Sequence, residues 1–527
     1  MIRRNRLHLL VAAAAGTGLM LAGCQSGSSQ GEDAVTLTIG TTDKVTSIDP
    51  AGSYDNGSLM VQNQVYQYLM NFAEGSTELS PDAAESCEFV DPVTFRCTIK
   101  DGLTFANGND LTASDVAFSF QRIVEINDAN GPASLLSGME SVEALDDSTV
   151  QFTLTLPNDQ TFPQVLATSA GPIVDEETYP ADAVLSDDDA VEAQGFSGAY
   201  TITEYEKGSL AQFSANPDYD GTYGTAKTQE VALVTYADSN NLKLDVAAGK
   251  IDVAYRTLTP TDIESLGGDD RVTVHTGAGG ALRFIMFNFS TMPGADDAQK
   301  LAIRQAVAAT IDREELATQV YKGSFTPAYS AVPEGQLGAI ESFAARYGEK
   351  PDIEAARKTL EDAGLTIPVA LPIQYNPDHY GSSSTEEYAL IKRQLEASGL
   401  FTVDLQSTEW VTYIKDVFAD KYPIFQLGWT PDFPDADNYV TPFFSEGSFP
   451  THYVDPRMAE LLNAQKVETD TAKRTELLGQ IQDLAAENVP ILPLLTGSQI
   501  AVAGTDVKGV AETLDASFKF RFSSLSK

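Results

Sequence analysis

Positive charge is scarce in this chain of 527 residues, which has 34 lysines and arginines against 75 aspartates and glutamates and a formal net charge of −41. Nucleic acids and anionic lipid surfaces both attract basic side chains, so this balance excludes either as an electrostatic partner. Hydrophobic residues still make up 43% of the chain. A chain of this length and composition is expected to fold into two or three domains and not to be disordered.

Signatures of catalysis and metal binding are also missing. The chain has no HExxH, Walker A or CxxC motif, and residues 195–199 (GFSGA) depart from the GxSxG pattern at the last position. After the N-terminal segment the histidines are His275, His379 and His452, and no two of them have the spacing of metal ligands. The sequence therefore predicts a protein that is not an enzyme and that needs no metal and no cofactor.

An apolar run of notable length occurs only at the N-terminus, where Leu7 to Leu21 follows three arginines and is interrupted at residues 16–18. The run is too short and too interrupted for a comfortable membrane span. It ends in residues 21–24 (LAGC), which resemble the lipobox of bacterial lipoproteins. The resemblance implies a signal peptide over 1–23, a lipidated Cys24, and attachment to the cell membrane on its extracellular or periplasmic face. An ordinary secretory signal with an incidental cysteine is the alternative.

The segment after Cys24 is a flexible tether by composition, since residues 24–33 are polar and rich in glycine and serine. With Cys24 lipidated, only Cys87 and Cys97 remain. A turn signal at Asp91-Pro92 lies between them, and the residues around Cys97 alternate as in a strand. We expect a hairpin with a cross-strand disulfide, which suits an oxidising compartment. A metal-binding thiol pair is disfavoured because no histidine is near.

Secondary-structure signals divide the chain into a strand-rich first half and a more helical second half. Residues 35–40 and 150–156 alternate as strands, 231–236 form an apolar run typical of a strand buried on both faces, and Thr112 begins a capped helix. Later segments predict helices over 301–311, 312–323, 352–364 and 388–399, with strands over 369–374, 401–405 and 424–429. Alternating strands and helices indicate an α/β lobe, so the whole chain is mixed α/β (α+β).

Several segments in a fixed order carry a resemblance to a known family. These are residues 81–86 (PDAAES), 103–108 (LTFANG), 111–116 (LTASDV), 198–200 (GAY), 216–219 (NPDY), 246–253 (VAAGKIDV) and 303–313 (IRQAVAATIDR). Together they resemble the extracellular solute-binding proteins of peptide ABC importers, the oligopeptide- and dipeptide-binding class known as solute-binding protein family 5. Actinobacterial lipoproteins of this family are the most similar.

The resemblance implies a two-lobed periplasmic-binding-protein-like fold that closes on its ligand. Lobe I would comprise 34–279 and 489–527, with an inserted subdomain over about 73–192, and lobe II would comprise 280–488. Apolar strands near 283–288 and 491–494 would connect the lobes.

The resemblance also implies the binding site. A peptide of variable sequence is held by its backbone and its charged ends. In the family an aspartate three residues after a Gly-Trp pair receives the ligand's ammonium group. Here that residue is Asp432, with Trp429 as a pocket wall; a turn-capping loop aspartate is the alternative. The further candidates are Tyr54 and Asn56 after the first strand, Trp410 and Tyr439 as pocket aromatics, and Arg283 as partner of a ligand carboxylate.

The function implied is a lipid-anchored, monomeric substrate-binding component of an ABC transporter, which captures short peptides and delivers them to a membrane permease for transmembrane transport. Alternatives on the same fold are a nickel chelate, a sugar or an opine-like conjugate as ligand. A surface sensor or adhesin, or a peptidase, is a different class; the missing nucleophile and base motifs disfavour the peptidase.

Overall fold

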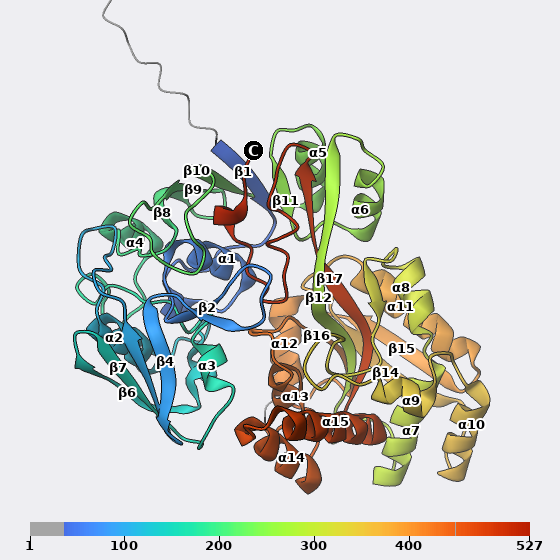
Figure 1. Ribbon diagram of the computed structural model, residues 1–527. Helices are drawn as coiled ribbons and strands as arrows, with labels where there is room; N and C mark the ends of the chain where they lie inside the picture. Colours follow the sequence, from blue (N-terminus) through green and yellow to red (C-terminus); the bar gives the residue numbers. More distant parts are fainter. Residues whose placement is uncertain (1–35, 448) are drawn as a thin grey trace, which may run out of the picture. The chain divides into compact units, whose positions relative to one another are not determined.

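The computed structural model describes residues 36–447 and 449–527 (Figure 1). Its largest sheet has eleven strands, and all but one of them follow a single order across the sheet. In that order they are β15 (Phe401–Ser407), β14 (Val369–Tyr375), β16 (Ile424–Trp429), β12 (Val272–Phe287), β17 (Ile491–Gly504), β11 (Val253–Tyr255), β1 (Thr36–Thr41), β10 (Glu230–Thr235), β9 (Leu210–Ala215) and β8 (Tyr200–Glu206). The short β13 (Phe325–Pro327) pairs with β17 outside this order.

The two longest strands, β12 and β17, form an antiparallel ribbon at the centre of this sheet. The first half of β12 pairs with the part of β17 that also pairs with β11. The second half of β12 pairs with β16 on its other edge. The register of the ribbon shifts between residues 276 and 281 of β12, which marks bulges where a strand bends. The ribbon is therefore the place where the chain passes from one half of the sheet to the other.

A second sheet of four antiparallel strands lies within the predicted insertion. Its order is β4 (Ala84–Asp91), β5 (Thr94–Ile99), β7 (Thr149–Leu154) and β6 (Met139–Asp146). The predicted disulfide joins Cys87 on β4 to Cys97 on β5, which face each other in the register. The hairpin β2 (Met70–Phe72) and β3 (Leu79–Pro81) forms a third, two-stranded sheet.

Most helices before β12 begin at side-chain caps that the sequence supplies, the exceptions being η2 and α3. In α2 the side chain of Thr112 accepts from Ser114 N, while the side chain of Asp115 accepts from Thr112 N, so the predicted cap is a capping box. The helical elements of this part are η1 (Pro50–Gly52), α1 (Asn56–Val65), α2 (Ala113–Ile126), η2 (Ala133–Leu136), α3 (Phe162–Val165), α4 (Asp187–Ala193), α5 (Ser239–Ala247) and α6 (Pro260–Leu266).

Aspartate side chains cap α7, α8, α10, α14 and α15 among the helices after β12. Asp352 caps α10, and Gly364 adopts a φ of 72° just beyond its end. The helical elements of this part are α7 (Asp297–Thr310), α8 (Arg313–Gln319), α9 (Ser342–Tyr347), α10 (Ile353–Asp362), α11 (Ser384–Ala397), α12 (Trp410–Phe418), α13 (Asp437–Phe444), α14 (Pro456–Val467), α15 (Thr471–Asn488) and η3 (Phe522–Ser524).

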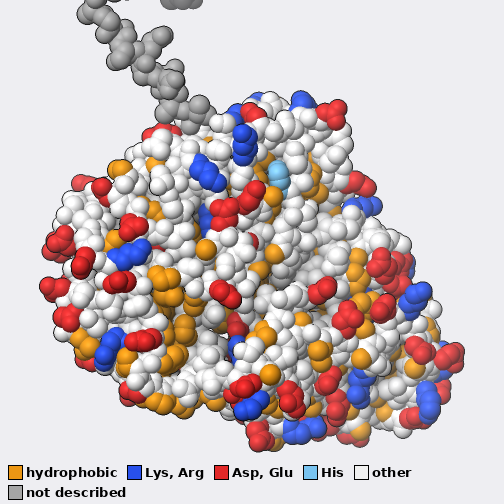
Figure 2. Space-filling view, in the orientation of Figure 1, with side chains coloured by type: hydrophobic (Ala, Val, Ile, Leu, Met, Phe, Trp, Pro, Cys, Tyr) orange, Lys and Arg blue, Asp and Glu red, His pale blue; other side chains and the backbone are white. Residues whose placement is uncertain are grey.

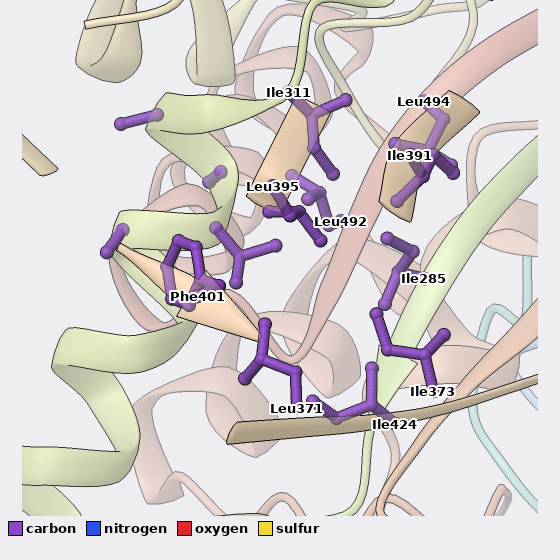
Figure 3. Close-up of a cluster of buried hydrophobic side chains, with 14 of the residues drawn as sticks. Ile285, Ile311, Leu371, Ile373, Ile391, Leu395, Phe401, Ile424, Leu492 and Leu494 are labelled. Atoms are coloured by element: carbon purple, nitrogen blue, oxygen red, sulfur yellow. The ribbon is translucent and has the colours of Figure 1, made fainter. Parts of the chain in front are cut away.

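Separate hydrophobic cores support the parts of the fold. Figure 3 shows one of them, in which side chains from β12, β14, β15, β16, β17 and α11 meet. Its labelled members are Ile285, Ile311, Leu371, Ile373, Ile391, Leu395, Phe401, Ile424, Leu492 and Leu494. Another core fills the space between the four-stranded sheet and α2. Each such side chain, fully buried, contributes about 1.5–3 kcal/mol.

The mixed α/β class is confirmed, and so are the strands and helices expected in the second half of the chain. One expectation about burial is wrong. The run 231–236 is β10, in which only Val231 and Leu233 are fully buried, because its other face is half-exposed. The lobe and insertion boundaries stay predictions. The lipobox, Cys24 and the tether lie outside the described residues, among which no helix is long and apolar enough to cross a membrane.

Candidate functional site

Asp432 lies in the loop that follows β16, and hydrogen bonds fix its carboxylate. Its Oδ1 accepts from the Tyr54 hydroxyl at 2.5 Å, and its Oδ2 accepts from the Asn438 side-chain amide at 3.1 Å. The side-chain oxygen of Asn438 in turn accepts from Asp432 N at 2.8 Å and from Trp429 Nε1 at 3.1 Å. One buried asparagine on α13 thus holds both the tryptophan and the aspartate of the predicted site.

The loop is anchored on both sides of Asp432. Phe433 is buried in the core of the four-stranded sheet and α2. Asp435 makes two hydrogen bonds with Arg474 on α15, at 2.7 and 2.8 Å, and both side chains are largely buried. A bidentate pair of this kind fixes geometry as well as charge. Asp432 therefore sits on a rigid support.

Electrostatics at Asp432 disfavour its charged form in the structure as it stands. Burial raises the pKa of the Asp432 carboxyl, and the hydrogen bonds from Tyr54 and Asn438 oppose this shift. None of the ion pairs formed within residues 36–447 and 449–527 includes Asp432. The carboxylate is half-buried and lacks a cationic partner in this part of the chain.

Tyr439 contributes a buried hydroxyl to the same group. The side chain is fully buried on α13, and its hydroxyl has no hydrogen-bond partner among the described residues. Burial, and then the charge of Asp432, raise the pKa of this phenol above its ordinary value. A Cβ on Gly280 of β12 would lie 2.9 Å from the Tyr439 hydroxyl, so the ring lies against the central ribbon.

Tyr54 and Asn56 come from the segment between η1 and α1. Tyr54 is 41% exposed, and Asn56 is the first residue of α1, whose cap is Asp55. One face of α1 lines a small pocket together with Tyr255, Arg256, Phe518 and Phe520. The residues of α1 in this pocket are Asn56, Leu59, Met60 and Asn63.

This pocket adjoins the group around Asp432. A Cβ on Gly280 would lie 3.0 Å from the ring of Phe518, which lines the pocket, as well as against Tyr439. Phe518 has a φ of 58°, a left-handed conformation that is rare for a bulky residue. Tyr54 bonds Asp432 two residues before Asn56 enters the pocket wall. The carboxylate, the two tyrosines and the pocket are thus contiguous.

Arg283 and Trp410 belong to a second group, centred on Tyr380. Arg283 lies opposite Gly428 in the β12–β16 register, and its guanidinium is 4.8 Å from the centre of the Tyr380 ring and 5.3 Å from that of Phe325. Trp410, the first residue of α12, stacks on His379 at 3.7 Å and meets the Tyr380 ring edge-on. Within residues 36–447 and 449–527, neither residue makes a hydrogen bond or ion pair with Asp432.

The structure therefore places four of the predicted residues together, namely Asp432, Trp429, Tyr54 and Tyr439. Asn56 lies in the wall of the adjoining pocket, while Arg283 and Trp410 lie apart around Tyr380. Asn438, Arg256 and Phe518 were not predicted. Asn438 follows the Gly-Trp pair closely in the sequence and could have been considered as a site residue. Nothing in the sequence alone indicates that Arg256 and Phe518 lie near that pair in the fold.

A family model described as "Bacterial extracellular solute-binding proteins, family 5 Middle" matches residues 78–450, well over half of the chain. This chain belongs to that family. The predicted family is thereby confirmed. The protein is a solute-binding component of ABC importers and not an enzyme. Members of this family act on the extracellular or periplasmic side of the membrane.

Curated relatives of this solute-binding protein match nearly their full lengths. Di/tripeptide-binding protein 1 of Pseudomonas aeruginosa is 26% identical, with 89% of this chain and 88% of that protein covered. The oligopeptide-binding protein OppA of Bacillus subtilis is 25% identical, with 92% and 91% covered.

Solved structures share the fold. A dipeptide-binding protein from a Pseudoalteromonas species, in complex with Met-Leu, has a TM-score of 0.78 at 21% identity, covering 94% of this chain and all of that one. The substrate-binding protein CtaP of Listeria monocytogenes has a TM-score of 0.79 at 24% identity, covering 94% and 99%.

The chemistry of the group around Asp432 is suited to recognition. The Asp432 carboxylate has no cationic partner and the buried Tyr439 hydroxyl no hydrogen-bond partner among the described residues. Together with the aromatic walls, these groups can hold a cationic group in a place from which water is largely excluded. Groups of three or more histidine, cysteine, aspartate or glutamate side chains that could hold a metal do not occur among the described residues.

Proposed function

We propose that this solute-binding protein captures short peptides and that Asp432 receives their free ammonium group. One observation carries the proposal, namely the half-buried Asp432 carboxylate, which has two neutral hydrogen-bond donors and no cation in the described part of the chain. An ion that has lost water needs an opposite charge, and a ligand ammonium supplies it. The relatives with di- and tripeptide- or oligopeptide-binding names support the same class of ligand.

The setting of this activity is also part of the proposal. We infer that the protein is a monomer, anchored through lipid on Cys24, with the polar residues 24–33 as a tether. The loaded protein would then pass its peptide to the permease of an ABC importer. Figure 2 shows separate groups of acidic side chains on the face it displays, with fewer basic ones interspersed, in keeping with a protein that is held near a membrane by lipid and not by charge.

The experiment is calorimetric titration of the purified chain with peptide pools of two to eight residues, each pool prepared free and N-acetylated. We expect the free pools to bind and acetylation to lower their affinity about 10- to 100-fold, the effect of losing one charge-assisted contact. Asp432→Asn should lower the affinity for free peptides by a similar factor and abolish the difference between the two forms.

Asp362→Asn is the matched control, because it removes one negative charge from an exposed pair with Lys358 on α10. It should leave both affinities unchanged. Peptide binding that is indifferent to acetylation would remove Asp432 from its role and keep the ligand class. Pools that do not bind in any form would reject peptides, and the nickel chelate, sugar or opine-like ligands would be tested next.

A further inference from the structure

Loops join the two halves of the large sheet at a second place, away from the central ribbon. The first half contains β1 and β8 to β11, and the four-stranded sheet lies in the chain between β1 and β8. The second half contains β14, β15 and β16, and the loop after β16 carries Phe433. Phe433 is 5% exposed, and every other buried member of the core that it enters comes from residues 51–173. A side chain of the second half is thus buried in a core of the first.

The turn between β7 and α3 makes another contact between the halves. Its Gln160 N donates to Lys466 O at 3.0 Å. Lys466 lies in the last turn of α14, where backbone carbonyls lack partners within the helix. The turn is held by its own hydrogen bonds, because Asp159 Oδ1 accepts from Thr161 N at 2.9 Å and from the Thr161 hydroxyl at 2.7 Å. The first half therefore offers the Gln160 amide to α14 from a preformed turn.

A buried arginine of the second half lies between carboxylates of both halves. Arg474 makes its two hydrogen bonds with Asp435, which follows Phe433 by two residues. Burial lowers the pKa of the Arg474 guanidinium, but the hydrogen bonds and charge of Asp435, and then the charges of Asp437 and Asp159, raise it above its ordinary value. Asp159 belongs to the turn of the first half and is 2% exposed. Its attraction to Arg474 is strengthened because water is largely excluded there.

This contact is coupled to the ligand site through the chain itself. Asp432 directly precedes Phe433, and Tyr54 of the first half donates to its carboxylate. Separation of the halves would break this bond and the bond from Gln160, and would expose the Phe433 ring to water. Exposure of a buried aromatic ring is unfavourable. The contact therefore favours the joined arrangement of the halves.

We propose that Phe433 and the 158–161 turn form a catch that keeps the two halves joined over a captured ligand, so that the four-stranded sheet sets how slowly the ligand leaves. The proposal rests on the proposed function, because it takes the ligand to be held beside Asp432. It assigns to the four-stranded sheet a part in retention without any contact with the ligand. A catch that closes after the ligand has entered acts on the dissociation rate and not on the association rate.

The test compares two variants with the unaltered chain. Phe433→Ala removes the buried ring, and Asp159→Asn removes the charge near Arg474 while it keeps an oxygen for Thr161. Dissociation of free peptide pools, two to eight residues long, is followed by tryptophan fluorescence after dilution. We expect dissociation to be about tenfold faster in Phe433→Ala and about two- to threefold faster in Asp159→Asn, with association rates that change less than about twofold.

Hydrogen exchange gives a readout that needs no ligand. The Gln160 amide is bonded across the contact, so its exchange rate reports how often the halves separate there. We expect this amide to exchange about tenfold faster in ligand-free Phe433→Ala than in the unaltered chain, since the ring no longer opposes separation.

A matched control distinguishes the contact from the stability of the core. Leu136 is 2% exposed in the same core and belongs to the first half. Leu136→Ala should lower the melting temperature and leave both the dissociation rate and the exchange of the Gln160 amide unchanged. Asp362→Asn serves as the control for the loss of a negative charge. Thermal unfolding of each variant verifies that it is folded.

The outcomes separate this proposal from the proposed function. If Phe433→Ala changes neither dissociation nor the exchange at Gln160, the catch is rejected and peptide capture stands. If Leu136→Ala has the same effects as Phe433→Ala, the stability of the core controls release and the catch is again rejected. If no pool binds, the proposed function is rejected, and with it the role of the catch in retention.

Discussion

At the scale of single residues, the site depends on one amide. Asn438 is 4% exposed and satisfies the Trp429 indole, the Asp432 backbone and the second oxygen of the Asp432 carboxylate. Buried polar groups without partners cost about 1–3 kcal/mol each, so this one side chain relieves three such penalties in part. It orients the carboxylate and is not itself proposed to contact the ligand.

Asn438→Leu should therefore weaken the protein and the site together. We expect a loss of about 2 kcal/mol in the free energy of unfolding, because the replacement keeps the volume and removes every hydrogen bond. Trp410→Phe leaves Trp429 as the only tryptophan, so its fluorescence reports the lost indole contact directly. The emission of Trp429 should change in Asn438→Leu and not in Asn241→Leu, an exposed position on α5. An unchanged spectrum would show that the amide does not hold the indole.

The sequence supported a prediction for some residues and not for others. Asp432 and Trp429 belong to a short motif, and the family resemblance implied their roles before the structure was described. Arg256 could not be predicted, because its place in the pocket depends on β11 lying beside β1 and β17, partners that are far away in the chain. For Arg283 the sequence shows a charge within an apolar strand, and only the structure shows the aromatic rings around it.

At the scale of elements, local patterns predicted most of what formed. Caps and stop glycines marked α2 and α10, and the alternation around Cys97 predicted the β4–β5 hairpin with its disulfide. The prediction that 231–236 is buried on both faces was wrong, because apolar residues in a sequence do not show which faces of a strand other elements cover. In the structure, only one face of β10 is covered. The end-to-end length of β12 was likewise hidden, since residues 276–281 are rich in glycine and read as a break.

Helix α11 carries a buried carboxyl that makes stability depend on pH. Glu387 is fully buried; one oxygen accepts from the Tyr321 hydroxyl at 2.7 Å and the other has no partner among the described residues. Burial raises the pKa of Glu387 to about 7, against opposing effects of Tyr321 and Arg283. Because this value lies above that of an unfolded glutamate, the folded state holds the proton more tightly. The contribution of Glu387 to stability is thus full below about pH 4.5 and is lost as the pH rises through 7.

Glu387→Gln should remove this dependence, because glutamine resembles the protonated acid and can still accept from Tyr321. We expect the variant and the unaltered chain to have the same melting temperature at pH 5. At pH 8.5 the variant should melt at a higher temperature, because its free energy of unfolding is then greater by up to about 3 kcal/mol. Thermal unfolding across this pH range measures the difference, with Asp362→Asn on the surface as a control. A difference that stays constant with pH would show that Glu387 does not titrate in this window.

At the scale of the whole molecule, the family resemblance carried what local patterns could not. Nothing in the composition or periodicity assigns 491–504 to a sheet that begins at residue 36, yet β17 pairs with β11 at one end and with the second half of β12 at the other. Such pairings are set by cores assembled from distant segments, as where Phe433 enters the core of the four-stranded sheet. The same long-range packing brings Tyr54 to Asp432.

Gly280 lies where the two halves of the large sheet meet, and its lack of a side chain matters there. It has a φ of 153° and lies at the register shift of β12 between Gly279 and Ala281. A Cβ would lie 2.9 Å from the Tyr439 hydroxyl on one side and 3.0 Å from the Phe518 ring on the other.

Gly280→Ala should push these rings apart, strain the ribbon and lower peptide affinity about tenfold, the effect of roughly 1–2 kcal/mol of overpacking. Gly279→Ala is the matched control, since its nearest contacts are 3.5 Å or more away. Calorimetry on both variants decides the matter: equal affinities would mean that the ribbon tolerates the added methyl group, and that the contact between Tyr439, Gly280 and Phe518 does not couple the two halves of the site.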